Sequence, residues 1–149
     1  MLREDLTAPP KQRLRLLRPS GVLVLEEPEI SSWTVYPPSE PTQRLVDLIL
    51  RSFTEAGGDF NAGRALPDLL GERGLQPAIR ADVVALPPGH ACLGLPQQFA
   101  SSLGPRLLNI TTEAELDGLV AASRQDTVES ARWGLTFTLI QTWSRRRPD

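Results

Sequence analysis

Three stretches of the chain have the apolar patterns of β-strands. Residues 21–25 are continuously apolar and partly β-branched, and they are followed by Glu26 and Glu27. This pattern predicts a strand buried on both faces, as in a parallel α/β sheet. Residues 78–86 predict a second strand, which prolines stop. Residues 135–143 alternate between apolar and polar side chains and predict a third strand.

Before and between these strands, apolar residues recur at the three- and four-residue spacing of amphipathic helices. The helices predicted in this way cover residues 10–18, 42–56, 64–73 and 96–108, the last being interrupted near Gly104 and Pro105. A capping-box sequence at residues 111–115 predicts a further helix over residues 111–124. Residues 28–41 contain four prolines and predict a long ordered loop. The order of elements predicts an α/β fold, a single domain over residues 1–149 in which helices flank a small three-stranded mixed sheet.

Charge and composition exclude several classes of function. Sixteen basic and eighteen acidic side chains give a net charge of -2, which argues against binding to nucleic acid or an anionic membrane. The longest apolar run is far too short for a membrane span, and the first residues carry charges of both signs, so we expect a cytoplasmic protein. A single histidine, His90, and a single cysteine, Cys92, leave no metal site to be expected.

Residues 17–28, with the sequence LRPSGVLVLEEP, are similar to a segment of class I S-adenosylmethionine-dependent methyltransferases. In that family the segment joins the fourth helix to the fifth strand. Residues 58–70 resemble the stretch that follows it in small-molecule methyltransferases of bacterial secondary metabolism, and residues 133–139 resemble their last strand. The resemblance extends from Leu14 to Trp143. It implies the C-terminal half of a Rossmann-like fold, with the last strand antiparallel between the other two.

The resemblance also implies a transferase whose methyl-donor site lies elsewhere. The family binds S-adenosylmethionine through its N-terminal half, with a glycine-rich loop after the first strand. Here Gly57 and Gly58 follow a predicted helix, so the donor-binding motif is absent and no cofactor-binding residue is assigned. The implied role is an acceptor pocket for a hydroxylated or aromatic natural product, held by the loop after Glu27 and the segment around His90. Two alternatives stay open: a donor-independent cyclase or isomerase, and a non-catalytic binding or assembly subunit.

In the full fold the fifth strand has a fourth strand beside it. This chain has no such neighbour, so the apolar residues from Val22 to Leu25 would form an exposed sheet edge. We therefore expect a partner on this edge, either a second copy in a homo-oligomer such as a dimer or a separate chain.

Two residues are candidates for catalysis. His90 follows a strand in a rigid turn and has the only side chain that titrates near neutral pH, so it is a candidate general base. Glu26 ends a strand, where α/β folds place ligands, and its carboxylate is a second candidate. The structural alternatives are an exposed loop histidine and a solvated carboxylate.

Five further residues are candidates for substrate binding. Glu27 shares the strand-end position, and Trp33 and Tyr36 offer an aromatic wall for a flat ligand. Asn61 and Arg64 lie at a turn and a helix start, where Arg64 is placed to contact an acidic group. The structural alternatives are a loop anchored by its aromatic residues and a helix cap at Asn61.

Overall fold

The computed structural model describes residues 18, 20–127 and 131–145. In this part of the chain the first sheet has the strand order β1-β6-β3, formed by β1 (Val22–Glu29), β6 (Thr138–Arg145) and β3 (Ala78–Asp82). The second has the order β2-β5-β4, formed by β2 (Thr34–Tyr36), β5 (Trp133–Leu135) and β4 (Ala85–Leu86). Every neighbouring pair is antiparallel. The fold is therefore α/β, but the predicted single mixed sheet is replaced by two antiparallel ones.

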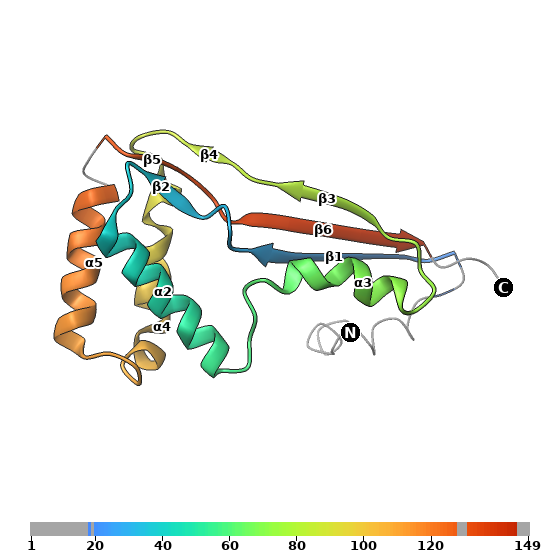
Figure 1. Ribbon diagram of the computed structural model, residues 1–149, viewed down its shortest axis with the longest axis horizontal. Helices are drawn as coiled ribbons and strands as arrows, with labels where there is room; N and C mark the ends of the chain where they lie inside the picture. The colour runs from blue at the N-terminus through green and yellow to red at the C-terminus, as the bar shows by residue number, and fades with distance from the viewer. Residues whose placement is uncertain (1–17, 19, 128–130, 146–149) are drawn as a thin grey trace.

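The two sheets follow one another as a bent, three-stranded ribbon (Figure 1). At the bend, hydrogen bonds from side chains replace part of the strand ladder. The Ser32 hydroxyl donates to the Thr136 carbonyl at 2.8 Å and lies 2.8 Å from the Thr138 hydroxyl. The Val84 N–H donates to the Thr136 hydroxyl at 3.0 Å, and the Thr136 N–H donates to the Val84 carbonyl at 3.0 Å. These bonds satisfy the backbone N–H and C=O groups of Val84 and Thr136 at the bend.

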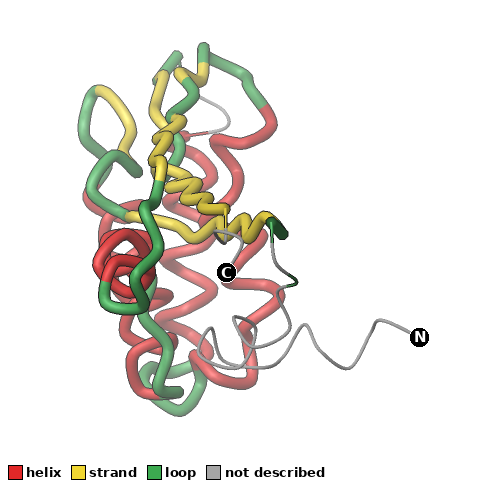
Figure 2. Tube along the Cα trace, turned by 90° about the vertical axis from the view of Figure 1, so that its right-hand side faces the viewer, coloured by secondary structure: helices red, strands yellow, loops and turns green. Residues whose placement is uncertain are grey.

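Three helices pack together beside the second sheet, as Figure 1 shows: α2 (Glu40–Glu55), α4 (Leu95–Leu107) and α5 (Glu113–Thr127). Two short 3₁₀ helices and a short α-helix complete the described elements: η3 (Ala62–Ala65), α3 (Leu66–Gly71) and η4 (Ala91–Gly94). In the end-on view of Figure 2, most of the helical segments lie below the strands. The main core lies between the three long helices, around Leu45, Ile49 and Leu107, which are fully buried.

β1 is buried on one face only. Leu23 and Leu25 pack against Leu66 and Leu70 around α3. On the opposite face Val24 is 63% exposed, because no element of the described chain covers it. The prediction of a strand buried on both faces is therefore wrong, and the exposed edge expected from the sequence is present, since β1 has β6 as its only neighbour among the described strands.

An aromatic cluster joins the bend of the ribbon to the helices. The Phe60 ring lies 6.2 Å from Trp33, 5.6 Å from Phe137 and 5.1 Å from Phe53, measured between ring centroids. Phe99 of α4 completes the cluster, 5.8 Å from Trp33. The break between β5 and β6 places Phe137 among these rings. The cluster therefore connects the strands with α2 and α4.

The helix predictions for α2, α4 and α5 are confirmed, and α4 continues through Gly104 and Pro105. Pro105 lies in the last turn of α4, so its missing N–H removes only one hydrogen bond of the helix. The strands predicted over 78–86 and 135–143 are each split by the bend, and the loop predicted over 28–41 contains the end of β1, all of β2 and the start of α2. The helix predicted over 10–18 falls almost entirely outside the described residues.

The last strand of the chain, β6, lies between β1 and β3 and is antiparallel to both. This is the arrangement expected for the three strands. Within the described residues, none of the helices has the length and apolar character that crossing a membrane requires.

Candidate functional site

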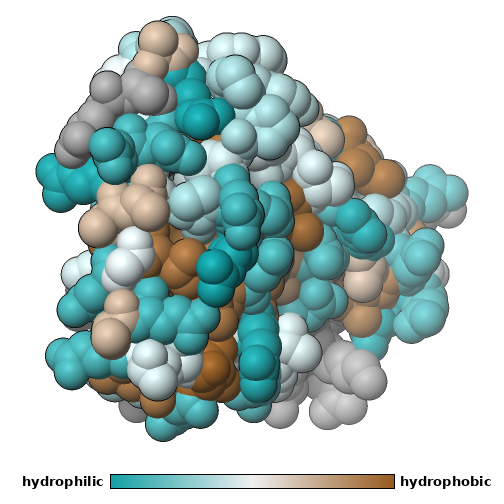
Figure 3. All heavy atoms as spheres, turned by 60° about the vertical axis from the view of Figure 1, so that its left-hand side comes forward, coloured by the Kyte–Doolittle hydropathy of each residue, from teal (hydrophilic) through white to brown (hydrophobic). Residues whose placement is uncertain are grey.

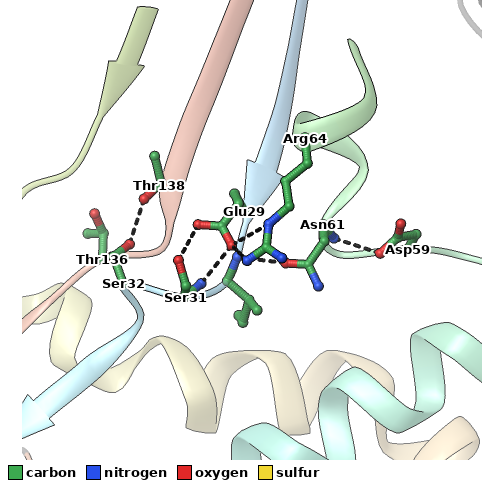
Figure 4. Close-up of polar contacts among 9 residues, drawn as sticks. Glu29, Ser31, Ser32, Asp59, Asn61, Arg64, Thr136 and Thr138 are labelled. Atoms are coloured by element: carbon green, nitrogen blue, oxygen red, sulfur yellow. Dashed lines mark hydrogen bonds and ion pairs between the residues drawn. The ribbon is translucent and has the colours of Figure 1, made fainter. Parts of the chain in front are cut away.

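Glu29, which the sequence analysis does not single out, forms the centre of a polar cluster at the end of β1 (Figure 4). Its side chain is largely buried, with 9% of its surface exposed. The carboxylate accepts hydrogen bonds from the Ser31 hydroxyl at 2.6 Å and the Ser31 N–H at 3.1 Å. It also accepts one from Nε of Arg64 at 3.0 Å, and the second nitrogen of the guanidinium forms an ion pair with it.

Burial by itself raises the pKa of the Glu29 carboxyl, but the hydrogen bonds from Ser31 and Arg64 together lower it by more. The net result is a pKa below the ordinary value of 4.5. Glu29 is therefore ionised at neutral pH and holds Arg64 in place.

Asn61 connects the same turn to the end of β1. Its side-chain oxygen accepts a hydrogen bond from the Ile30 N–H at 3.2 Å, and its own N–H donates to the Asp59 carboxylate at 2.8 Å. Asn61 and Arg64 thus hold η3 against the sheet. The acidic partner of Arg64 is Glu29 of this chain, and neither residue lines the cavity described below.

Glu26 and Glu27 are exposed on β1. The Glu26 carboxylate accepts a hydrogen bond from the side-chain amide of Gln141 on β6. Neither carboxylate lines the cavity described below.

A cavity of about 400 Å³ lies between the second sheet, the first turns of α2 and the start of α4. Its walls come from residues 33–46, from residues 86–96 and from β5. The first segment contributes Trp33, Thr34, Val35, Pro38, Ser39, Glu40, Thr42, Gln43 and Val46. The second contributes Leu86, Cys92, Leu93 and Pro96, and β5 contributes Leu135. The side of the molecule shown in Figure 3 is largely hydrophilic, with apolar surface in separate areas between polar side chains. The size and mainly apolar walls of the cavity are typical of small-molecule sites.

The hydroxyl groups on one wall of the cavity belong to a buried chain of hydrogen bonds. The Ser39 hydroxyl donates its only proton to the Asp126 carboxylate at 2.9 Å. Thr42 must therefore donate to Ser39 at 2.8 Å, and Ser123 must donate to Thr42 at 2.9 Å. Gln97 donates to Ser123 at 2.6 Å and begins the chain. Ser39 also caps α2, because its hydroxyl accepts the Thr42 N–H. The hydroxyls of Ser39 and Thr42 therefore have no spare proton to offer a ligand.

His90 does not line the cavity. It is exposed, and its Nδ1 accepts the Cys92 N–H at 3.1 Å, which caps η4. Cys92 is half-buried and forms part of the cavity wall. Tyr36 stacks on Trp133 with ring centroids 4.6 Å apart and is not part of that wall. Among the residues proposed from the sequence, Trp33 is therefore the one that the structure places in the cavity.

The described residues do not fit S-adenosylmethionine, the methyl donor that the resemblance implies. Such a donor site needs a glycine-rich turn after a strand, where the backbone approaches the ligand closely. The turn that follows β1, over residues 30–33, has no glycine, the turn that follows β4 has the single glycine Gly89, and Gly57 and Gly58 follow α2. A glycine-rich turn after a strand is therefore not found in residues 18, 20–127 and 131–145.

Across the same residues, no group of three or more histidine, cysteine or acidic side chains is arranged to hold a metal ion. No family model matches the sequence. A search of curated proteins also finds no match.

Proposed function

We propose that this chain supplies the acceptor-binding pocket of a methyltransferase-like protein of bacterial small-molecule metabolism. The methyl donor is then held by a partner or by another segment of polypeptide. The observation that best supports this proposal is the origin of the cavity walls. Residues 33–46, in the loop after Glu27 and the first turns of α2, form one side, and residues 86–96, around His90, form much of the other. These are the two regions that the resemblance assigns to the acceptor.

The strand arrangement supports the same proposal. β1, β6 and β3 have the order and relative directions that the resemblance implies for the last three strands of the full fold.

The cavity favours a neutral, mainly apolar acceptor. Trp33, Val35, Leu86 and Leu93 provide apolar walls, and the indole of Trp33 offers a flat surface to a ring. Glu40 is exposed at the cavity, and its carboxylate can accept a hydrogen bond from an acceptor hydroxyl. A molecule of about one or two aromatic rings with one hydroxyl group fits a space of this size.

One observation favours a second candidate function, a binding subunit without catalysis. His90 and Glu26, the two candidate catalytic residues, lie outside the cavity wall. In the described residues, Glu40 and Cys92 are the only titratable groups that line it. A pocket with so few groups for acid or base catalysis is suited to binding and orienting a molecule.

The pocket is tested with 2-naphthol, a neutral two-ring compound with one hydroxyl, titrated calorimetrically into the full chain. We expect saturable binding, and a loss of affinity of at least about tenfold in Thr34→Trp, because the new indole fills the cavity. Val83→Trp is the matched control, since Val83 is 48% exposed and does not line the cavity. Equal binding by all three chains, or no binding by any, contradicts the pocket.

The dependence on an external donor site is tested by titrating the same chain with S-adenosylhomocysteine. We expect no heat of binding from the chain alone at concentrations where 2-naphthol saturates. Micromolar binding of S-adenosylhomocysteine would show that this chain builds a donor site by itself, and the proposed dependence on a partner would then be wrong.

A further inference from the structure

The outer edge of β1 is open in the described part of the chain, where β6 is its only neighbouring strand. An open edge presents backbone donors and acceptors that another strand can pair with. The side chains beside it are unusually apolar for an exposed surface. Val22 is 47% exposed and Val24 is 63% exposed, and Trp143, directly across from Val24 on β6, is 38% exposed.

The two ends of β1 carry opposite charges. Arg145 pairs across the sheet with Val22, and Arg18 precedes the strand, whereas Glu26 and Glu27 lie toward the other end. All four side chains belong to exposed residues, and none forms an ion pair with another described residue. Antiparallel pairing of two identical strands brings the acidic end of each beside the basic end of the other.

We propose that a second copy of this chain pairs with β1 in antiparallel orientation, giving a two-fold symmetric dimer with a continuous six-stranded sheet. The contact is isologous, so the same strand is used by both copies and the assembly closes. The association does not use the cavity, and it therefore goes beyond the proposed function without depending on it.

Symmetry and the side-chain pattern select one register. A two-fold axis perpendicular to the sheet keeps the open faces of both copies on the same side. Two residues that face each other across the axis must then both have even numbers or both have odd numbers, because side chains alternate between the two faces along each strand. With the axis at Val24, that residue faces the partner's Val24, and Val22 faces the partner's Glu26. An axis at Leu25 would place Val24 against the partner's Glu26, and an axis at Leu23 would place Glu26 against the partner's Ser20.

The Val24 register also joins the exposed apolar residues of both copies. Val24 and Trp143 lie in one row across the first sheet, and the partner's row continues it across the axis. Glu26 of each copy then lies two strands away from the partner's Arg145, on the same face. Pro28, which cannot donate a backbone hydrogen bond, falls opposite the partner's Ser20, outside the strand.

The other edge of the same sheet is a poorer site for pairing. β3 is shorter than β1, and its two charged side chains, Arg80 and Asp82, already form an ion pair at 2.8 Å. Its charges are thus compensated within the strand, so they add no attraction for a second copy. This contrast favours β1 as the edge that associates.

The mass of the full chain in solution tests the dimer. We expect sedimentation from about 1 to 200 µM to show a monomer–dimer equilibrium, because one strand pair is a small interface. Val24→Lys should raise the dimer dissociation constant at least about tenfold, since it places two like charges at the axis. Ile79→Lys is the matched control, because Ile79 is 55% exposed on β3 and should leave the dimer unchanged.

A monomeric wild-type chain at all concentrations overturns the proposal, even if a different chain later binds the same edge. A dimer that persists in Val24→Lys and weakens in Ile79→Lys places the contact on β3, and it also overturns the proposal.

Cross-linking tests the register directly. In a Cys92→Ala background, Val24→Cys places two thiols opposite each other at the axis, at the spacing of facing residues in an antiparallel pair. We expect oxidised glutathione to convert this variant into a disulfide-linked dimer at least about ten times faster than Val22→Cys in the same background, whose thiol faces the partner's Glu26. Equal rates, or faster cross-linking at position 22, contradict the register.

Discussion

At the scale of single residues, three neighbouring carboxylates show how position along one strand sets their different roles. Glu26 and Glu27 are exposed, whereas Glu29 lies on the same face of β1 as Leu23 and Leu25 and is buried. A carboxylate at such a depth needs hydrogen-bond donors, and Arg64 and Ser31 provide them. The ion pair between the buried Glu29 and the exposed Arg64 therefore belongs to the structure that holds η3 on the sheet.

The lowered pKa of Glu29 predicts a specific dependence of stability on pH. A carboxyl whose pKa is lower in the folded than in the unfolded chain stabilises the fold fully at pH values above the unfolded pKa of 4.5. That stabilisation is lost as the pH falls through the pKa of the folded chain. We expect Glu29→Gln to lower the free energy of unfolding by about 1 to 2 kcal/mol at pH 7, a range reduced because Arg64 is largely exposed to solvent. The difference between the two chains should shrink below pH 4.5.

Urea unfolding from pH 3 to pH 8 (about one pH unit per step) measures this difference. Glu55→Gln is the control, because Glu55 pairs with Arg51 on the surface of α2, and its loss should cost no more than about 0.5 kcal/mol. A difference between wild type and Glu29→Gln that stays constant down to pH 3 would show that the carboxylate does not contribute through its charge.

At the scale of elements, the close approach of η3 to the first sheet depends on a glycine. A Cβ atom at Gly63 would lie 2.8 Å from Cγ1 of Ile140 and 2.9 Å from the carbonyl oxygen of Glu27. The second of these atoms is backbone and cannot move without displacing β1. The bonds of Asn61 and Arg64 to the end of β1 depend on the same approach.

Gly63→Ala should therefore lower the free energy of unfolding by about 1 to 3 kcal/mol, the usual cost of overpacking. Gly118→Ala is the matched control, because a Cβ there meets no atom within 4 Å and the residue lies inside α5. That change should raise stability by about 0.5 to 1 kcal/mol, since alanine is the better helix former. Urea denaturation measures both, and an unchanged stability in Gly63→Ala would show that η3 can move away from the sheet at little cost.

The sequence predicts the long elements well and the bend of the ribbon poorly, for a physical reason. Apolar spacing along α2 is a local signal, and it selects Leu45 and Ile49, which the core buries completely. The capping box before α5 is also local, because its residues lie within five positions of one another. The bend is stabilised by Ser32 and Thr136, which lie 104 residues apart in the chain. Because such contacts form only in the folded molecule, local periodicity predicts two long strands where the structure has four shorter ones.

At the scale of the whole molecule, the candidate site is also a product of tertiary contacts. Its walls combine residues from the loop after β1, from η4 and from β5, so that residue type in the sequence identifies Trp33 but not its neighbours. The two segments expected to hold an acceptor do meet at the cavity. The His90 side chain caps η4 by accepting the Cys92 N–H, and residue type alone does not reveal that role.

The aromatic cluster predicts that strands and helices unfold together. Phe60 is 9% exposed and contacts rings from the loop after β1, from α2 and α4, and from the bend between β5 and β6. Phe60→Leu should lower the free energy of unfolding by about 1 to 2 kcal/mol, because it removes ring contacts and leaves a small cavity. Leu108→Ala, at a residue that is 47% exposed, should change it by less than about 0.5 kcal/mol.

Circular dichroism measured during urea unfolding separates two outcomes for Phe60→Leu. The far-ultraviolet signal reports the helices, and the near-ultraviolet signal reports the packing of the aromatic rings. If the cluster couples the two layers, both signals change at the same urea concentration in the wild type and in Phe60→Leu, and both midpoints shift to lower urea in the variant. A near-ultraviolet transition that precedes the far-ultraviolet one would mean that the ribbon separates from α2, α4 and α5 before the helices unfold, and the cluster would then not hold the molecule together as one unit.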